Sequence, residues 1–283
     1  LIFCMQVAKI DYNDKDAPAA FTKSLKNTGF GLIVNHPILP ELVDTVYKEW
    51  AEFFHSESKH AFLFDPLKQD GYFPLGTENA KGYIAKDHKE FFHFYLWGRI
   101  PETISPATKE LYNSLVNMTS ILLEWIELNT PPKIRSKFSE PLKDMITGSK
   151  TNLLRIIHYP PFIGVEDARS LWAAAHEDIN LITLLVAGTK PGLEAQDKNG
   201  NWHKISTDPG TIIVNIGDML KETSGGYYPS TTHRVVNPAE SSDNNSRYSM
   251  PLFLHPRDDV QLSKEYSAKA YLKERLSEIG LKS

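Results

Sequence analysis

The chain has 283 residues, of which 41% are hydrophobic and 23% charged, so it can bury a sizeable core and a disordered chain is excluded. Lys and Arg number 31 against 35 Asp and Glu, a net charge of -4, which argues against a nucleic-acid or anionic-membrane surface. The single cysteine, Cys4, excludes an intrachain disulfide and indicates a reducing compartment, with the cytoplasm as the default.

The N-terminus carries no signal-peptide pattern. Residues 1–5 are apolar, but Gln6 and Lys9 follow at once, so the apolar stretch is too short for a signal-peptide core. We expect Met5 to be the true start and the four residues before it to be a remnant. No apolar run approaches the roughly 18 residues of a membrane span, which predicts a soluble protein, with a monomer as the default.

The first elements alternate between strand and helix. Residues 7–11 and 30–34 have the pattern of short strands, and residues 17–27 that of a helix ended by Gly29. Pro40 begins an amphipathic helix whose apolar face is typical of a core contact.

Residues 65–100 differ because they mix turn residues with dense aromatics. Such a segment is typical of loop and edge strand, and its aromatics either line a pocket mouth or pack on the core. Residues 107–129 then predict a long helix, and a further helix is expected within residues 132–146.

From residue 152 onward the pattern changes to short strands separated by turn signals such as Asp208-Pro209-Gly210. The predicted strands lie near residues 153–158, 181–186, 193–196, 201–204, 211–215, 231–235 and 247–254. A last helix is expected over about residues 263–279.

Many short strands with regular turns predict a mainly β fold with flanking helices, built on a double-stranded β-helix, or jelly roll. We assign residues 1–150 to an N-terminal mixed helical region. Residues 151–283 form the β-helix with its C-terminal helix, and the two parts are expected to pack as one unit.

Three residues in the second half are candidate metal ligands. His176 and Asp178 are two apart, so on an extended segment both side chains point to the same face. A later His233 would complete two imidazoles and a carboxylate on one side of a metal. This arrangement suits non-haem Fe(II), because it leaves coordination positions open, but it also serves catalytic zinc.

A candidate anion site follows. Arg247 and Ser249 are again two apart, so a guanidinium and a hydroxyl share a face and can receive a carboxylate. A buried arginine is costly without an anion to meet it, so a carboxylate co-substrate is expected here.

Ordered motifs extend along most of the chain. In the N-terminal part they are Thr28-Gly29-Phe30-Gly31, Asn35-His36, Gly71-Tyr72 and Asp87-His88-Lys89-Glu90. In the C-terminal part they are Leu154-Arg155, His158-Tyr159-Pro160-Pro161, His176-Glu177-Asp178, Val214-Asn215-Ile216-Gly217-Asp218, His233-Arg234-Val235 and Arg247-Tyr248-Ser249. With these motifs the sequence resembles the iron- and 2-oxoglutarate-dependent dioxygenases of the isopenicillin N synthase-like group.

The resemblance implies an activity and a set of metal ligands. His176, Asp178 and His233 would bind Fe(II) and carry catalysis, with O₂ as the oxidant and ascorbate as a supplementary reductant. In this family 2-oxoglutarate is decarboxylated to succinate and CO₂ while a small molecule is oxidised. Hydroxylation is the expected outcome, and desaturation and ring closure also occur.

The resemblance also implies how the co-substrate is held. Arg247 and Ser249 would bind the distal carboxylate of 2-oxoglutarate, with the Tyr159 hydroxyl as a third contact. The family's Asn-Tyr-Tyr-Pro motif here has Ile157 in place of its asparagine, so that contact is absent, and Asn152 is no evident replacement.

Substrate contacts are assigned by analogy to five residues: His158, Phe162, His93, Tyr95 and Tyr227. A turn that secures strand geometry is the preferred interpretation of Asn215, Gly217 and Asp218, and Arg234 is read as an ion-pair partner. Three alternatives stay open: an iron-dependent oxidase of the same fold that does not use 2-oxoglutarate, a zinc hydrolase, and a non-catalytic metal or small-molecule binding module.

Overall fold

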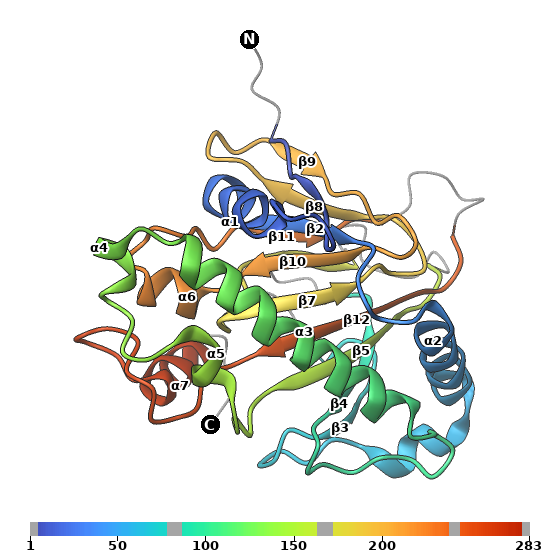
Figure 1. The fold of residues 1–283 in the computed structure, drawn as a ribbon. Helices are drawn as coiled ribbons and strands as arrows, with labels where there is room; N and C mark the ends of the chain where they lie inside the picture. The colour runs from blue at the N-terminus through green and yellow to red at the C-terminus, as the bar shows by residue number, and fades with distance from the viewer. Residues whose placement is uncertain (1–4, 78–86, 163–171, 238–243, 279–283) are drawn as a thin grey trace.

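The computed structural model describes residues 5–77, 87–162, 172–237 and 244–278 (Figure 1). Cys4 and the proposed N-terminal remnant therefore lie outside the described residues. The strands are β1 Lys9–Asp11, β2 Phe30–Val34, β3 Gly71–Phe73, β4 Glu90–Phe94, β5 Leu153–Tyr159, β6 Ala173–His176, β7 Ile182–Val186, β8 Leu193–Gln196, β9 Trp202–Lys204, β10 Ile212–Ile216, β11 His233–Val235 and β12 Arg247–Leu254. The helices are α1 Ala17–Thr28, α2 Pro40–His55, the 3-10 helix η1 Glu57–Phe62, α3 Ala107–Asn129, α4 Pro132–Arg135, α5 Leu142–Ile146, α6 Asp218–Thr223 and α7 Ala268–Glu278.

The strands form two sheets. The larger has the order β1-β2-β10-β7-β12-β5-β4-β3, and the smaller has the order β6-β11-β8-β9. Apart from the parallel pair β1 and β2, neighbouring strands run antiparallel. This mainly β architecture with flanking helices confirms the predicted jelly-roll fold class.

Successive residues of the larger sheet face two different layers, as the pleat of a strand requires. On β5, Leu154 and Ile156 belong to the core that the sheet shares with helices α1, α2 and α3, and Figure 1 shows α3 crossing that face. Ile157 and Tyr159 belong to a second apolar cluster between the two sheets. We call the space between the sheets the lumen; it is the side on which the site lies.

The ends of the first elements follow from local chemistry. Helix α1 ends at Gly29, which adopts a φ of 74° and donates its amide to the carbonyl of Leu25. A Cβ on Gly29 would lie 2.2 Å from Oγ1 of Thr231, so glycine also allows the close contact between α1 and the segment before β11. Helix α2 begins at Pro40 as predicted, because proline fits the first helical turn.

Several predicted bounds are confirmed, namely those of β2, β8, β12 and α3. The segment from 132 to 146 holds two short helices, α4 and α5, because Pro141 interrupts a continuous helix. The last helix begins at Ala268 and not near residue 263, since Ser263 instead accepts the amides of Glu265 and Tyr266 in a turn.

The N-terminal region contributes to the sheet as well as to the helices. Strands β1 and β2 extend the larger sheet beyond β10, and β3 and β4 extend it beyond β5. The aromatics of β3 and β4 are buried, which favours the core interpretation over the pocket-mouth one. A division between two regions at residue 150 stays a prediction.

Among the described residues, none of the helices combines the length and the apolar composition that crossing a bilayer requires.

Candidate metal and anion site

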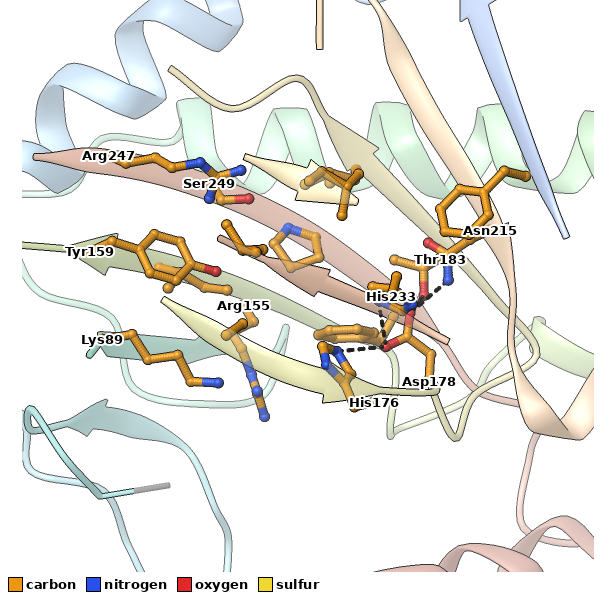
Figure 2. Close-up of a pocket in the computed structure, with 18 residues that line it drawn as sticks. Lys89, Arg155, Tyr159, His176, Asp178, Thr183, Asn215, His233, Arg247 and Ser249 are labelled. Atoms are coloured by element: carbon orange, nitrogen blue, oxygen red, sulfur yellow. Dashed lines mark hydrogen bonds and ion pairs between the residues drawn. The ribbon is translucent and has the colours of Figure 1, made fainter. Parts of the chain in front are cut away.

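Three side chains converge at one end of the lumen (Figure 2). His176 ends β6, Asp178 lies two residues further on, and His233 begins β11 directly opposite His176 in the antiparallel register. The Nε2 atoms of both histidines lie 3.8 Å from Oδ1 of Asp178. The candidate ligand atoms of the three residues all lie within 4.8 Å of one another.

The backbone fixes which nitrogen of each imidazole faces the centre of this group. Nδ1 of His176 lies 2.8 Å from the carbonyl of Ala174, and Nδ1 of His233 lies 3.1 Å from the carbonyl of Thr231. Because a carbonyl only accepts, each Nδ1 carries a proton, and in the neutral imidazole each Nε2 presents a lone pair. Two lone pairs and a carboxylate oxygen that face one another without a proton fit a bound cation.

Asp178 is held as an acceptor on its other oxygen. Thr183 donates its hydroxyl to Oδ2 at 2.6 Å, and the Asn215 amide donates to the same oxygen at 2.8 Å. Burial by itself would raise the pKa of Asp178, but the neighbouring imidazoles of His233 and His176 and these two hydrogen bonds outweigh it, so the pKa is lowered. Oδ1 is thereby left as the charged ligand atom.

Desolvation and the nearby His233, against the opposing effect of Asp178, together lower the pKa of His176 to about 4. The ammonium of Lys89 acts in the same direction as desolvation. His176 is therefore neutral at neutral pH, which is the form that coordinates a metal.

Arg247 lies in the same pocket, which has a volume of about 590 Å³ including its open mouth. The residue is only 1% exposed, and its Nε donates to the carbonyl of Lys190 at 3.1 Å. Nη1 is buried with no hydrogen-bond partner, and no ion pair found among the described residues includes Arg247. A buried guanidinium in this state is costly, so the arrangement fits an incoming anion.

Ser249 and Tyr159 line the same pocket. Arg247 pairs with Tyr159 across β12 and β5, and its guanidinium carbon lies 4.9 Å from the Tyr159 ring centre. Figure 2 shows the Tyr159 hydroxyl pointing into the pocket, and Arg247 with Ser249 at the end away from the three candidate metal ligands.

The structure does not place the five predicted substrate contacts in the lining of the pocket. His158 lies on the opposite face of β5 from Ile157 and Tyr159, because side chains alternate along a strand. There it contacts Glu90 at 2.7 Å and Ser246 at 2.9 Å.

The other four predicted contacts pack elsewhere. Phe162 stacks on His88, Tyr95 stacks on Trp97, and the Tyr227 ring meets the ammonium of Lys26. His93 is buried and contacts a pocket residue, Arg155, without lining the pocket itself.

Sequence reasoning missed four polar residues of the pocket: Thr183, Asn215, Lys89 and Arg155. Asn215 was read as part of a turn, but it lies within β10 and pairs with Thr183 of β7 across the larger sheet. Both side chains thereby reach Asp178 from neighbouring strands. The alternation of side chains along β7 and β10 could have indicated these two residues, since it places both of them on the lumen face.

Gly217 is correctly read as structural, and Arg234 as an ion-pair partner. A Cβ on Gly217 would lie 2.0 Å from the carbonyl oxygen of Asn180, so the segment after β10 packs directly on the loop that carries Asp178. Arg234 pairs with Glu194 at 2.8 Å. Asn152 bonds backbone groups of Ile146 and His255, in agreement with its having no co-substrate role.

Comparison with known proteins adds independent findings. The family described as the 2OG-Fe(II) oxygenase superfamily matches residues 150–256, and the non-haem dioxygenase in morphine synthesis N-terminal family matches residues 6–114. A crystal structure assigned as an oxygenase of Shewanella oneidensis is 49% identical, with a TM-score of 0.89, over 98% of this chain and 99% of that one.

Two further relatives are more distant. Jasmonate-induced oxygenase 2 of Arabidopsis thaliana is 28% identical over 86% of this chain, and the match spans 66% of its own length, just under two thirds. A Neurospora crassa protein has been solved at full length in complex with alpha-KG and thymine. It is 21% identical to this chain, with a TM-score of 0.79 over 96% of each chain, so the similarity is one of fold.

The hydrogen bonds to Asp178 lead to a first prediction. Asn215→Ala and Thr183→Val should each weaken Fe(II) binding by about 10- to 100-fold, because each leaves the ligand carboxylate less fixed. Anaerobic metal titration measures this effect. Asn201→Ala, which removes a side-chain amide that donates to Asp197 in the exposed turn between β8 and β9, is the control and should leave metal affinity unchanged. Unaltered affinity in both pocket variants would contradict the role given to these bonds.

The close contact at Gly217 leads to a second prediction. Gly217→Ala should lower the free energy of unfolding by about 1–3 kcal/mol and weaken metal binding, because the loop of Asp178 must shift. Gly148→Ala is the control, because a Cβ there meets nothing within 4 Å and its φ of 74° alone causes strain. Denaturant unfolding should detect a loss in both variants, and metal titration a loss only at Gly217.

Proposed function

Because the chain belongs to the 2OG-Fe(II) oxygenase superfamily, we propose that it oxidises a small molecule with Fe(II), 2-oxoglutarate and O₂, at the site formed by its lumen residues. His176, Asp178 and His233 are the proposed metal ligands and catalytic centre. Arg247, Ser249 and Tyr159 are the proposed receptor for the distal carboxylate of 2-oxoglutarate.

One observation carries the proposal: a buried arginine with an unpartnered Nη1 lies in the same pocket as two imidazoles and a carboxylate. A zinc hydrolase would give the three ligands a role but would leave the arginine without an anion. The same reasoning disfavours an iron oxidase that does not use 2-oxoglutarate. A carboxylate co-substrate gives a role to both halves of the pocket.

When bound, the iron supplies the oxidative chemistry, in which 2-oxoglutarate yields succinate and CO₂ and the substrate is oxidised, with hydroxylation as the proposed outcome. The chain positions the reactants. Arg247 and Ser249 fix one end of the co-substrate by charge-assisted hydrogen bonds, so its other end faces the metal.

The protein also controls protons and water around the ligands. The carbonyls of Ala174 and Thr231 keep Nδ1 of each imidazole protonated and Nε2 available to the metal. Thr183 and Asn215 donate to Asp178 and hold it as an anion. The apolar lining limits water in the pocket.

The substrate class is proposed from relatives. Since the Neurospora crassa structure holds thymine, we propose a small molecule and not a macromolecule as the substrate. We further propose a cytoplasmic enzyme that acts as a monomer, with ascorbate as a supplementary reductant. Release of succinate that requires both Fe(II) and 2-oxoglutarate, and rises with a substrate from a metabolite panel, tests this function. No succinate under any condition would contradict it.

The co-substrate receptor leads to a third prediction. Arg247→Gln should weaken 2-oxoglutarate binding by about 2–5 kcal/mol, as when a buried charge pair loses one partner, while Fe(II) binding is retained. Calorimetric titration of each ligand measures both effects. Arg275→Gln on α7, a residue that does not line the pocket, is the matched control and should bind 2-oxoglutarate normally.

Gly188→Ala tests the same receptor while leaving its charge in place. A Cβ at Gly188 would lie 3.0 Å from Nη2 of Arg247, so the guanidinium must shift. This variant should also weaken 2-oxoglutarate binding. Unchanged affinity in both Arg247→Gln and Gly188→Ala would contradict the assignment of Arg247.

A further inference from the structure

Two buried hydrogen-bond donors lie close together at the proposed co-substrate receptor. Nη1 of Arg247 and Nε1 of Trp172 are both buried, and among the described residues neither atom has a hydrogen-bond partner. Each of the two residues is only 1% exposed. A guanidinium and an indole N–H can only donate, so neither group can satisfy the other. Buried donors without an acceptor are costly, and one acceptor that reaches both would relieve both.

Trp172 immediately precedes β6 and packs in the apolar cluster between the two sheets. Its backbone amide donates to Oδ1 of Asn237 at 2.9 Å, which fixes the start of β6 to the segment after β11. A Cβ on Gly192 would lie 3.7 Å from Cζ3 of the Trp172 ring. Cζ3 lies across the indole from Nε1, so the N–H edge of the ring faces away from Gly192.

The Trp172 ring lies beside two residues of the receptor. Its centre is 5.8 Å from the guanidinium carbon of Arg247 and 5.6 Å from the ring centre of Tyr159. The Tyr159 ring centre is itself 4.9 Å from that guanidinium carbon. Two aromatic rings therefore hold the guanidinium in position without cancelling its charge. A carboxylate bound to Arg247 would lie next to the indole.

The distal carboxylate of 2-oxoglutarate has room for a further donor. Its two oxygens offer about four acceptor sites. One contact each from Nη1 of Arg247, the Ser249 hydroxyl and the Tyr159 hydroxyl would leave one site free. Trp172 supplies a single N–H, which matches what remains.

We infer that Trp172 is a further residue of the co-substrate receptor and that its indole N–H donates to the distal carboxylate of 2-oxoglutarate. This inference rests on the proposed function. The alternative is that Trp172 only packs against Arg247 and Tyr159. The two interpretations differ in the role of the nitrogen, and phenylalanine at this position keeps an aromatic ring but has no donor.

The wild-type chain tests the inference without a substitution at position 172. It carries nitrogen-15 in its five tryptophans and is loaded with Zn(II), which is diamagnetic and does not support oxidation. The indole N–H resonances are followed by NMR during titration with 2-oxoglutarate, after assignment by replacing each of the other tryptophans in turn with phenylalanine. The Trp172 resonance should shift and saturate with the Kd that calorimetry gives for 2-oxoglutarate. 2-Oxopentanoate, which lacks the distal carboxylate, should leave this resonance in place.

A variant then removes only the donor. Trp172→Phe should weaken 2-oxoglutarate binding by about tenfold or more, as for a hydrogen bond to a charged group, and should leave the affinities for 2-oxopentanoate and Zn(II) unchanged. Trp50→Phe is the matched control, because it removes an indole N–H that is also buried but donates to Oγ1 of Thr108 at 2.9 Å in the helix-side core. It should lower stability and retain 2-oxoglutarate affinity.

Three results would overturn the inference alone: a Trp172 resonance that stays in place in protein saturated with 2-oxoglutarate, unchanged 2-oxoglutarate affinity in Trp172→Phe, or an equal loss of affinity for 2-oxoglutarate and 2-oxopentanoate, which identifies a packing role. Failure of the wild-type protein to bind 2-oxoglutarate would contradict the proposed function and the inference with it. Calorimetry on the same sample detects that failure before any resonance is compared.

Discussion

The convergence of three acceptors on one point is the constraint on which the site depends. Two Nε2 lone pairs and an oxygen of Asp178 face one another, and neither imidazole can turn its proton inward while its Nδ1 is bonded to a carbonyl. The arrangement is unfavourable until a cation enters. The antiparallel pairing of β6 with β11, and the hydrogen bonds to Asp178, hold it in place beforehand.

A second unfavourable feature, the buried guanidinium of Arg247, lies on the larger sheet. Both features destabilise the folded chain. The large apolar core, in which one face of that sheet packs against α1, α2 and α3, offsets this destabilisation. Ligands that bind only the folded state raise the free energy of unfolding, and so offset part of this destabilisation. The chain belongs to the 2OG-Fe(II) oxygenase superfamily, and the proposed metal and co-substrate are expected to stabilise it as well as to react.

Spacing along single strands could be predicted from the sequence, whereas contacts between strands could not. The intervals of His176 to Asp178 and of Arg247 to Ser249 predicted two candidate sites. Arg247 and Ser249 share a face because both lie on β12, whereas Asp178 lies in the segment that follows β6. Asn215 was missed as a partner of Asp178 because that contact depends on the register between β7 and β10. Strand β6 was missed because its alanines carry no strand signal, and pairing with β11 defines it.

The five residues predicted to contact substrate do not line this pocket, and their role stays a prediction. His158 belongs to a motif next to Tyr159, but neighbouring residues on a strand face opposite layers, so only one of them can line the lumen. Arg155, three residues earlier, is on the lumen face with Ile157 and Tyr159. Counting every second residue of β5 back from Tyr159 selects Ile157 and Arg155 as residues that face the lumen.

The most direct measurement of the central claim is an anaerobic titration of the wild-type protein with Fe(II) and then 2-oxoglutarate, followed by visible absorption. If the metal and the co-substrate bind together in the lumen, a charge-transfer band appears only after the second addition and saturates at one equivalent of each. Absence of the band in protein that has taken up Fe(II) would contradict the account.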